Sequence, residues 1–428
     1  MWLSKATWLA PSGDLVGGAL QMTGGLIKTW PGRELAPEGA PSLDIAGKLV
    51  LPGLVDPHVH FRQPGGVVQE GIANGSRAAL VGGVTTVLDM PNTIPPTNTP
   101  ARFHHKRALF QAKSYVHWGV HMHADPGRRQ DVPGTAASLK VYMAKSSALP
   151  AVTTVEELAR LFRRYKRVAV HAEDETAFSS PGDEREPWRT HHEVRPLRAV
   201  TRALDKIEQA LEALPRAERP RVILCHMATA DEVAWLERMK HEQFDIWGET
   251  CPHYYLLDTT DVARLGSIAK VNPPIREAHH REAVLDGLRR GVVDFLGTDH
   301  APHLYGDKLN PKKAPSGIAG IEAFALTASL LVDRFGLTVP QLQALTSTNA
   351  GRCYELDRRG SIQDGHPADL CVLDSPRAPR RVVTKAATHP YQGKRFSRSV
   401  FATFVAGRPA YVDGTYLSFA HGQEVYSQ

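Results

Sequence analysis

The central part of the chain repeats one pattern about eight times: a short apolar strand, a polar or Gly/Pro loop, and an amphipathic helix. The predicted strands end near His60, Asn92, His123, Met143, His171, His226, Thr250 and Asp299, and the last of them covers 293–299. Helices are predicted between them, for example over 155–162, 199–214 and 281–290. Parallel strands need such crossovers, so the alternation predicts an α/β fold, a parallel (β/α)₈ barrel of the TIM type over 50–360.

The two ends of the chain follow a different pattern. Residues 1–49 and 361–428 read as short strands broken by Gly and Pro, such as 26–30 and 399–405. Because chain ends often lie close together, we expect these segments to pair as one small β-sandwich. The predicted domains are therefore a β-sandwich subdomain (1–49 plus 361–428) and a barrel (50–360).

Composition and charge exclude several classes of protein. The 428 residues include 42% hydrophobic and 22% charged residues, as in a soluble protein with a full core. The net charge of +6 is scattered rather than gathered in a basic tail, which argues against nucleic-acid binding. The first residues lack the apolar stretch of a signal peptide, and no run is long enough to span a membrane.

The cysteines indicate a reducing compartment. None of the four forms a C-x-x-C pair, and most lie in apolar runs where cysteine is a small core residue. We therefore expect a cytoplasmic protein. They are Cys225, Cys251, Cys353 and Cys371.

Potential metal ligands gather at the ends of the predicted strands. His58 and His60 are two residues apart, so both imidazoles leave one face of a strand, with Arg62 one step further. Singly, each such residue has an ordinary explanation: a hydrogen-bonded core histidine, a helix-capping aspartate or a surface lysine. Catalytic groups of barrels lie at the carboxyl ends of strands, so the set together predicts a metal site. The other strand-end members are Lys140, His171, His226 and Asp299.

Lys140 is the unusual member, because a protonated ammonium is repelled by divalent cations. A lysine carboxylated by CO₂ would instead be a carboxylate on a long arm that bridges two metal ions. Over nearly its whole length, the chain resembles a known family, the cyclic amidohydrolases, and most closely the dihydroorotases. The resemblance is carried by PGLVDPHVHFR (52–62), TTVLDMPNT (85–93), SLKVYMA (138–144), VAVHAEDE (168–175), ILCHMATADE (223–232), ETCPHYY (249–255), KVNPPIR (270–276), GTDHAPH (297–303) and KAPSG (313–317).

The resemblance implies a zinc-dependent hydrolase with two Zn²⁺ ions per chain. His58, His60 and Asp299 would hold one ion, and His171 and His226 the other. Carboxylated Lys140 would bridge them, although some dihydroorotases use an aspartate there. The implied reaction is the reversible hydrolysis of (S)-dihydroorotate to N-carbamoyl-L-aspartate, in de novo pyrimidine biosynthesis, by a metal-bridging hydroxide. Asp299 would take the proton of the hydroxide and pass it to the leaving nitrogen.

The carboxylate of dihydroorotate distinguishes it from hydantoin and allantoin. The resemblance implies that Arg62, Asn92 and His303 bind this carboxylate, and arginine offers a planar fork matched to it. Taken singly, Arg62 reads equally well as a surface arginine and Asn92 as a turn residue. The resemblance also implies ring contacts from Asn272, Pro315 and Gly317.

Two alternatives remain open from the sequence. A hydantoinase or allantoinase would share every metal ligand, so only the carboxylate-binding residues argue against it. An inactive partner of aspartate transcarbamoylase is disfavoured because every expected ligand is present. The family implies a homodimer and a small-molecule substrate. The loops 179–195 and 304–314 have no assigned role, although the second reads as a lid or a long surface loop.

Overall fold

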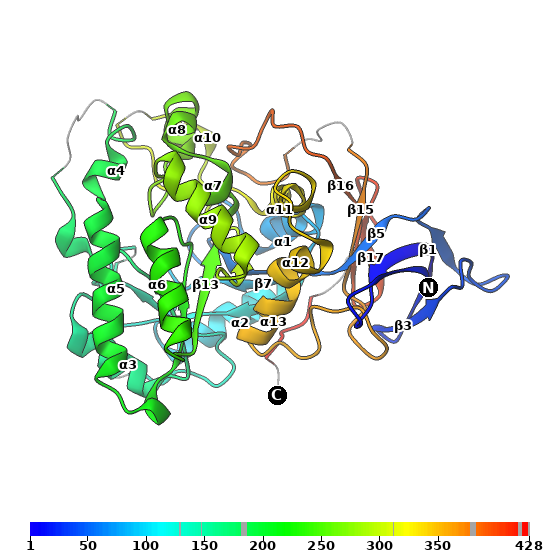
Figure 1. The fold of residues 1–428 in the computed structure, drawn as a ribbon, viewed down its shortest axis with the longest axis horizontal. Coiled ribbons are helices and arrows are strands. Elements are labelled where there is room, and N and C mark those ends of the chain that lie inside the picture. Colours follow the sequence, from blue (N-terminus) through cyan, green and yellow to red (C-terminus); the bar gives the residue numbers. More distant parts are fainter. Residues whose placement is uncertain are drawn as a thin grey trace.

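The computed structural model describes residues 1–127, 130–146, 148–180, 186–310, 312–376, 382–417 and 422–426. Its centre is built from parallel strands covered by helices, and a separate sheet lies to one side (Figure 1). The predicted α/β class is therefore confirmed. Loop residues 181–185 and 311, which belong to the two unassigned loops, lie outside the described residues.

Every strand pairing in the central region is parallel, as the βα alternation predicts. One sheet has the order β6-β7-β8, and a second has the order β14-β13-β12-β11-β10-β9. The strands of the first sheet are β6 (Leu54–Val59), β7 (Val84–Asp89) and β8 (His117–Val120). Those of the second are β9 (Met122–His123), β10 (Leu139–Tyr142), β11 (Arg167–His171), β12 (Arg221–Leu224), β13 (Ile246–Thr250) and β14 (Phe295–Leu296).

The end of the first strand of this region also meets the segment that follows the last strand. Val59 and His300 form a parallel bridge, and the amide of His60 donates to the carbonyl of His300 at 2.8 Å. β14 is shorter than the predicted strand over 293–299. The chain leaves the strand early because Thr298 bonds the buried carboxylate of Asp56 and Asp299 takes a positive φ of 44°.

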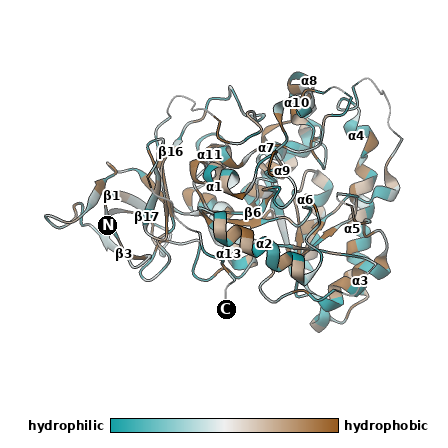
Figure 2. Ribbon diagram, turned by 180° about the vertical axis from the view of Figure 1, so that it is seen from behind, coloured by the Kyte–Doolittle hydropathy of each residue, from teal (hydrophilic) through white to brown (hydrophobic). Residues whose placement is uncertain are grey.

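Amphipathic helices connect the strands. Two of the longer ones begin at complete capping boxes, formed by Thr154 with Glu157 and by Thr229 with Glu232. Figure 2 shows α5 banded in brown and teal, as expected for a helix with one buried face. The longer helices are α1 (Ile72–Val81), α2 (Pro100–Lys113), α3 (Val155–Arg164), α5 (Leu197–Glu212), α6 (Ala230–His241), α9 (Ala278–Arg290) and α11 (Phe324–Asp333). The shorter ones are α4 (His191–Val194), α7 (Pro252–Leu256), α8 (Thr259–Leu265), α10 (Tyr305–Lys308), α12 (Val339–Gln343) and α13 (Asn349–Cys353).

The two chain ends pair with each other, as expected. β5 lies between β1 and β15, so N-terminal and C-terminal segments share one nine-stranded sheet with the path β18-β17-β16-β15-β5-β1-β2-β3, and β4 pairs with β1 (Figure 1). This sheet has its own apolar core, which includes Trp8, Leu20 and Phe404. Its strands are β1 (Trp2–Leu9), β2 (Leu15–Thr23), β3 (Leu26–Pro31), β4 (Ser42–Asp44), β5 (Leu49–Pro52), β15 (Leu370–Asp374), β16 (Ser399–Val405), β17 (Arg408–Val412) and β18 (Thr415–Tyr416).

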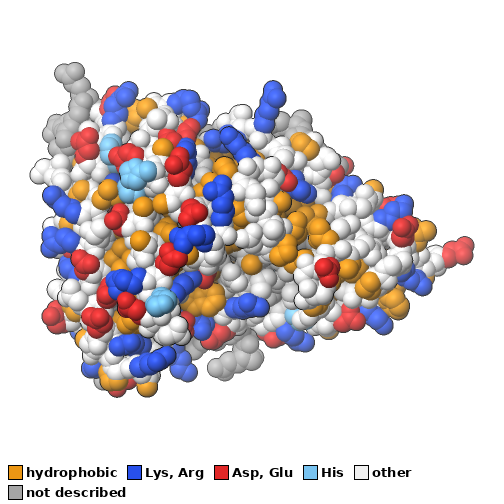
Figure 3. All heavy atoms as spheres, viewed as in Figure 1, with side chains coloured by type: hydrophobic (Ala, Val, Ile, Leu, Met, Phe, Trp, Pro, Cys, Tyr) orange, Lys and Arg blue, Asp and Glu red, His pale blue; other side chains and the backbone are white. Residues whose placement is uncertain are grey.

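The surface agrees with the composition. On the face shown in Figure 3, basic and acidic side chains are interspersed rather than separated into fields of one sign. Among the described residues, no helix is both long and apolar enough to cross a membrane. All four cysteines are buried and unpaired.

Candidate active site

The carboxyl ends of the parallel strands surround one cavity of about 440 Å³. Most of the predicted site residues line it, although they come from every part of the central region. Those residues are His58, His60, Arg62, Asn92, His171, His226, Asn272, Asp299, His303 and Gly317. Lys140 and Pro315 do not line the cavity: Lys140 is 1% exposed on β10, and the carbonyl of Pro315 accepts a bond from Lys308.

His58, His60 and Asp299 form the first half of the centre. Oδ1 of Asp299 lies 3.3 Å from Nε2 of His58 and 2.9 Å from Nε2 of His60. The ligand atoms of all three lie within 4.8 Å of one another, and all three are buried. These atoms therefore converge on one point that a metal ion fits.

The outer nitrogens of both histidines are held by acceptors. Nδ1 of His58 lies 2.6 Å from Oε1 of Glu249, and Nδ1 of His60 lies 2.7 Å from Oδ1 of Asn92. Because a carboxylate or amide oxygen can only accept, each Nδ1 carries the proton and donates. Each Nε2 of a neutral ring is then a lone pair aimed at the Asp299 carboxylate, an arrangement that a shared cation stabilises.

His171 and His226 form the second half. Nδ1 of His171 lies 2.9 Å from Nε2 of His226, while Nε2 of His171 bonds Glu173 at 3.0 Å. Glu173 is in turn ion-paired with Arg195. Nδ1 of His226 is buried without a hydrogen-bond partner among the described residues. Nδ1 of His171 and Nε2 of His226 therefore face each other in an arrangement that a shared cation would stabilise, as in the first half of the centre.

The charges of the site match this geometry. Burial lowers the pKa of His60 to about 4, although Asp299 opposes this change, so the ring is neutral and able to bind a metal. Burial disfavours the cation of His58, but Glu249 and Asp299 outweigh it and raise its pKa to about 10. Burial favours the neutral acid of Asp299, yet the imidazoles of His58 and His60 hold its pKa below the usual range. The site thus favours a positive charge between these three groups.

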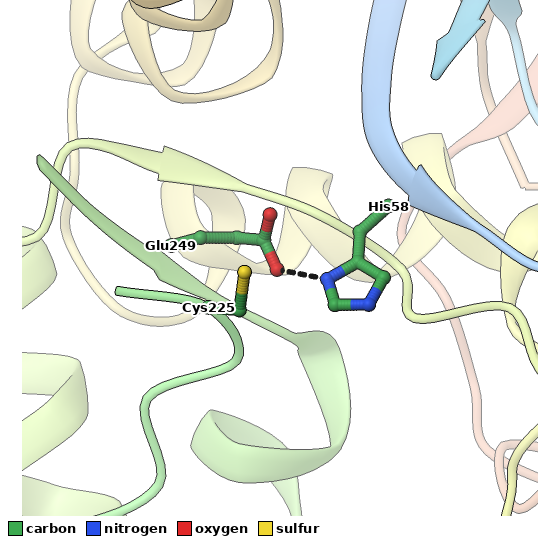
Figure 4. Close-up of side chains that lie close together, drawn as sticks. All are labelled: His58, Cys225 and Glu249. Atoms are coloured by element: carbon green, nitrogen blue, oxygen red, sulfur yellow. Dashed lines mark hydrogen bonds and ion pairs between the residues drawn. The ribbon is translucent and has the colours of Figure 1, made fainter. Parts of the chain in front are cut away.

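A second possible ligand group lies beneath the first. Cys225, which follows β12, and Glu249 of β13 approach the other edge of the His58 ring, as Figure 4 shows. Nζ of Lys140 lies 2.8 Å from Sγ of Cys225. Lys140 therefore reaches the base of the same centre from β10.

Two of the three predicted carboxylate-binding residues contact each other, and all three line the cavity. Nη2 of Arg62 lies 3.1 Å from Nε2 of His303, and Nδ2 of Asn92 donates to Ser146 at 3.1 Å. Gly317 has a φ of 146°, and a Cβ there would lie 2.4 Å from the carbonyl oxygen of Ala301. Only glycine therefore brings this part of the 313–317 segment against the cavity.

Several residues at the site were not predicted from the sequence. Glu249 and Glu173 hold the outer nitrogens of His58 and His171. Each carried a weak signal, because Glu249 lies at the end of a predicted strand and Glu173 lies two residues after a predicted ligand. His191, in the unassigned loop, bonds Oδ1 of Asn272 at 2.7 Å. Partners of this kind depend on tertiary contacts between distant segments.

Lys308 is a further residue near the site that the sequence did not predict. It is 4% exposed, and its Nζ bonds the carbonyls of Lys270 at 2.9 Å, Pro315 at 3.0 Å and Gly317 at 2.9 Å. Burial, together with the charge of Lys270, lowers its pKa to about 7. The 304–314 segment is thus anchored by α10 to the wall of the cavity.

Comparisons with known proteins identify the family of this chain. Residues 49–410 match the model of the amidohydrolase family. A dihydroorotase of Methanosarcina acetivorans is 32% identical over 82% of this chain and 79% of its own length. A dihydroorotase of Geobacillus thermodenitrificans is 30% identical over 95% of this chain and 97% of its own. The solved L-hydantoinase of Arthrobacter aurescens, at 24% identity, covers 99% of both chains with a TM-score of 0.88, a likeness of fold.

Proposed function

This chain belongs to the amidohydrolase family, and we propose on that basis that it is a dihydroorotase. The reaction is the reversible hydrolysis of (S)-dihydroorotate to N-carbamoyl-L-aspartate, a step of de novo pyrimidine biosynthesis. The supporting relatives named dihydroorotase extend over most of the chain. The observation that carries the proposal is one cavity lined by both the converging ligands and the group Arg62, Asn92 and His303.

The donor set supports a pair of zinc ions, because imidazole and carboxylate are ligands that Zn²⁺ prefers. His58, His60 and Asp299 would hold one ion and His171 and His226 the other, with carboxylated Lys140 between them. Zinc supplies Lewis-acid activation of water and of the ring carbonyl when bound. Carboxylation would also exchange the Lys140 cation for an anion, which suits a site built around positive charge.

We assign the proton transfers of the reaction to Asp299. Asp299 is ionised at neutral pH, since its pKa is held below the usual range, so it can accept a proton from the attacking water. It would then deliver that proton to the ring nitrogen as the C–N bond breaks. In the reverse direction, Asp299 would remove the proton of the carbamoyl nitrogen before ring closure. Glu249 and Asn92 would keep His58 and His60 in the orientation that this requires.

Substrate choice would depend on Arg62, with Asn92 and His303. A guanidinium carries its charge at all relevant pH values, so the buried Arg62 is best satisfied by a bound anion. Asn272, Pro315 and Gly317 would contact the ring. The hydantoinase alternative is favoured by fold likeness alone, because a neutral ring leaves Arg62 without an anion.

We extend the proposal to the architecture. The bridge between Val59 and His300 supports closure of the two parallel sheets into one (β/α)₈ barrel over 50–360. The separate core of the end sheet supports a β-sandwich subdomain of 1–49 plus 361–428. A cytoplasmic location, a homodimer and an association with aspartate transcarbamoylase are further proposals that follow from the family.

Steady-state assays test the function. We expect hydrolysis of dihydroorotate to exceed that of hydantoin and allantoin by orders of magnitude in kcat/KM. Arg62→Met should abolish this preference while metal content stays unchanged, because Arg62 contacts no predicted metal ligand in the described hydrogen bonds. Turnover of hydantoin with no turnover of dihydroorotate would refute the proposal.

A further inference from the structure

Tyr142, the last residue of β10, lines the cavity. It lies two residues after Lys140, so both side chains leave the same face of the strand. The ring is fixed by its neighbours: its centroid lies 4.9 Å from that of His123 and 6.2 Å from that of His171. The direction of the hydroxyl is therefore set by packing rather than by a hydrogen bond.

The hydroxyl of Tyr142 is unsatisfied. The residue is 5% exposed, and its oxygen has no hydrogen-bond partner among the residues that the structure describes. Burying a hydroxyl without a partner is unfavourable, and native proteins leave few such groups unexplained. For a group that lines a substrate cavity, a natural explanation is a partner that arrives with the ligand.

Arg62 lines the same cavity with a second unsatisfied donor. Its Nε is also buried without a partner in the described part of the chain. A guanidinium has no acceptor, and burial raises the pKa of the Tyr142 hydroxyl above its ordinary value, so the hydroxyl is a donor at neutral pH. Two donors that line one cavity and lack partners among the described residues call for an acceptor, and the charge of Arg62 makes an anion the best one.

We propose that the Tyr142 hydroxyl donates a hydrogen bond to the carboxylate of the bound substrate, beside Arg62. Tyr142 is then a substrate-binding residue that contributes to the preference for carboxylated over neutral cyclic amides. The identity of the carboxylate rests on the proposed dihydroorotase function. Because this carboxylate is not the reacting group, the bond is present equally in the ground state and the transition state.

Tyr142→Phe tests this role, since it removes one oxygen and keeps the packed ring. We expect KM for dihydroorotate to rise about tenfold, the lower end for a hydrogen bond to a charged group, while kcat changes less than threefold. The dissociation constant of orotate, a carboxylated ring that needs no turnover, should rise by a similar factor. Zinc content should stay at the wild-type value.

Tyr354→Phe is the matched control. Tyr354 is also buried, and its hydroxyl also lacks a partner among the described residues, but it does not line the cavity. Its KM and orotate affinity should equal those of the wild type. Tyr142→Leu serves as a second hydroxyl-free variant if Tyr142→Phe does not fold.

Unchanged orotate affinity in Tyr142→Phe would overturn the inference. A fall in kcat with unchanged orotate affinity would place the hydroxyl at the reacting carbonyl and would overturn it as well. The proposed function is judged separately, by turnover of dihydroorotate in the wild type. A failure of the Tyr142 inference can therefore be distinguished from a failure of the proposed function.

Discussion

Replacing Glu249 by Gln should weaken metal binding although Glu249 lies on the outer side of His58. Glu249 is fully buried on β13, and its Oε1 accepts from Nδ1 of His58 at 2.6 Å and from the amide of His226 at 3.2 Å. One oxygen therefore orients two predicted ligands. Partners of this kind change metal affinity by about 10–100-fold, or ~1.4–2.8 kcal/mol. Because Glu249 holds two ligands, we expect a value near the upper end.

The assay is competition for zinc against a chelator of known affinity, with kcat measured on the reloaded enzyme. The matched control is Glu322→Gln, because Glu322 is also a buried glutamate but bonds the amides of Val383 and Thr384. The control should bind zinc as the wild type does. An unchanged zinc affinity in Glu249→Gln would refute the reasoning that the carboxylate fixes the orientation of His58.

Three further outcomes are expected. Gly317→Ala should raise KM for dihydroorotate at least tenfold with metal retained, since its Cβ would clash with Ala301; an unchanged KM would contradict the close approach. Dialysis against a chelator should abolish activity and lower Tm, and zinc should restore both, because a ligand of the folded state stabilises it. The pKa of Lys308 is about 7 in the folded chain and about 10.4 when unfolded, so the unfolded state binds more protons between these values. The free energy of unfolding should therefore rise from pH 7 to 10 relative to Lys308→Met, measured by urea denaturation; a constant difference would contradict the shift.

The sequence predicted the strand order of the central region because each strand and helix carries its own local pattern. The strand ends at His60, His171 and His226 were predicted for this reason. The predicted strand over 293–299 was too long, because its early end depends on the contact of Thr298 with the distant Asp56.

The candidate ligands were predictable because all occupy one kind of position, the end of a parallel strand. Their partners were not. Glu249 meets His58 across 191 positions of the sequence, and Lys308 meets Lys270 across 38. No local pattern records such contacts, since they exist only when the strands and loops are assembled. The same holds for the hydroxyl of Tyr142, whose lack of a partner among the described residues is apparent only once its neighbours are in place.

The most direct test of the account is anomalous diffraction at the zinc edge from crystals of the zinc-loaded protein. We predict two anomalous peaks in the cavity, one within bonding distance of His58, His60 and Asp299, and one of His171 and His226. Density for a carboxylated Lys140 should lie between them. An empty cavity, or zinc bound only elsewhere on the chain, would contradict the central claim.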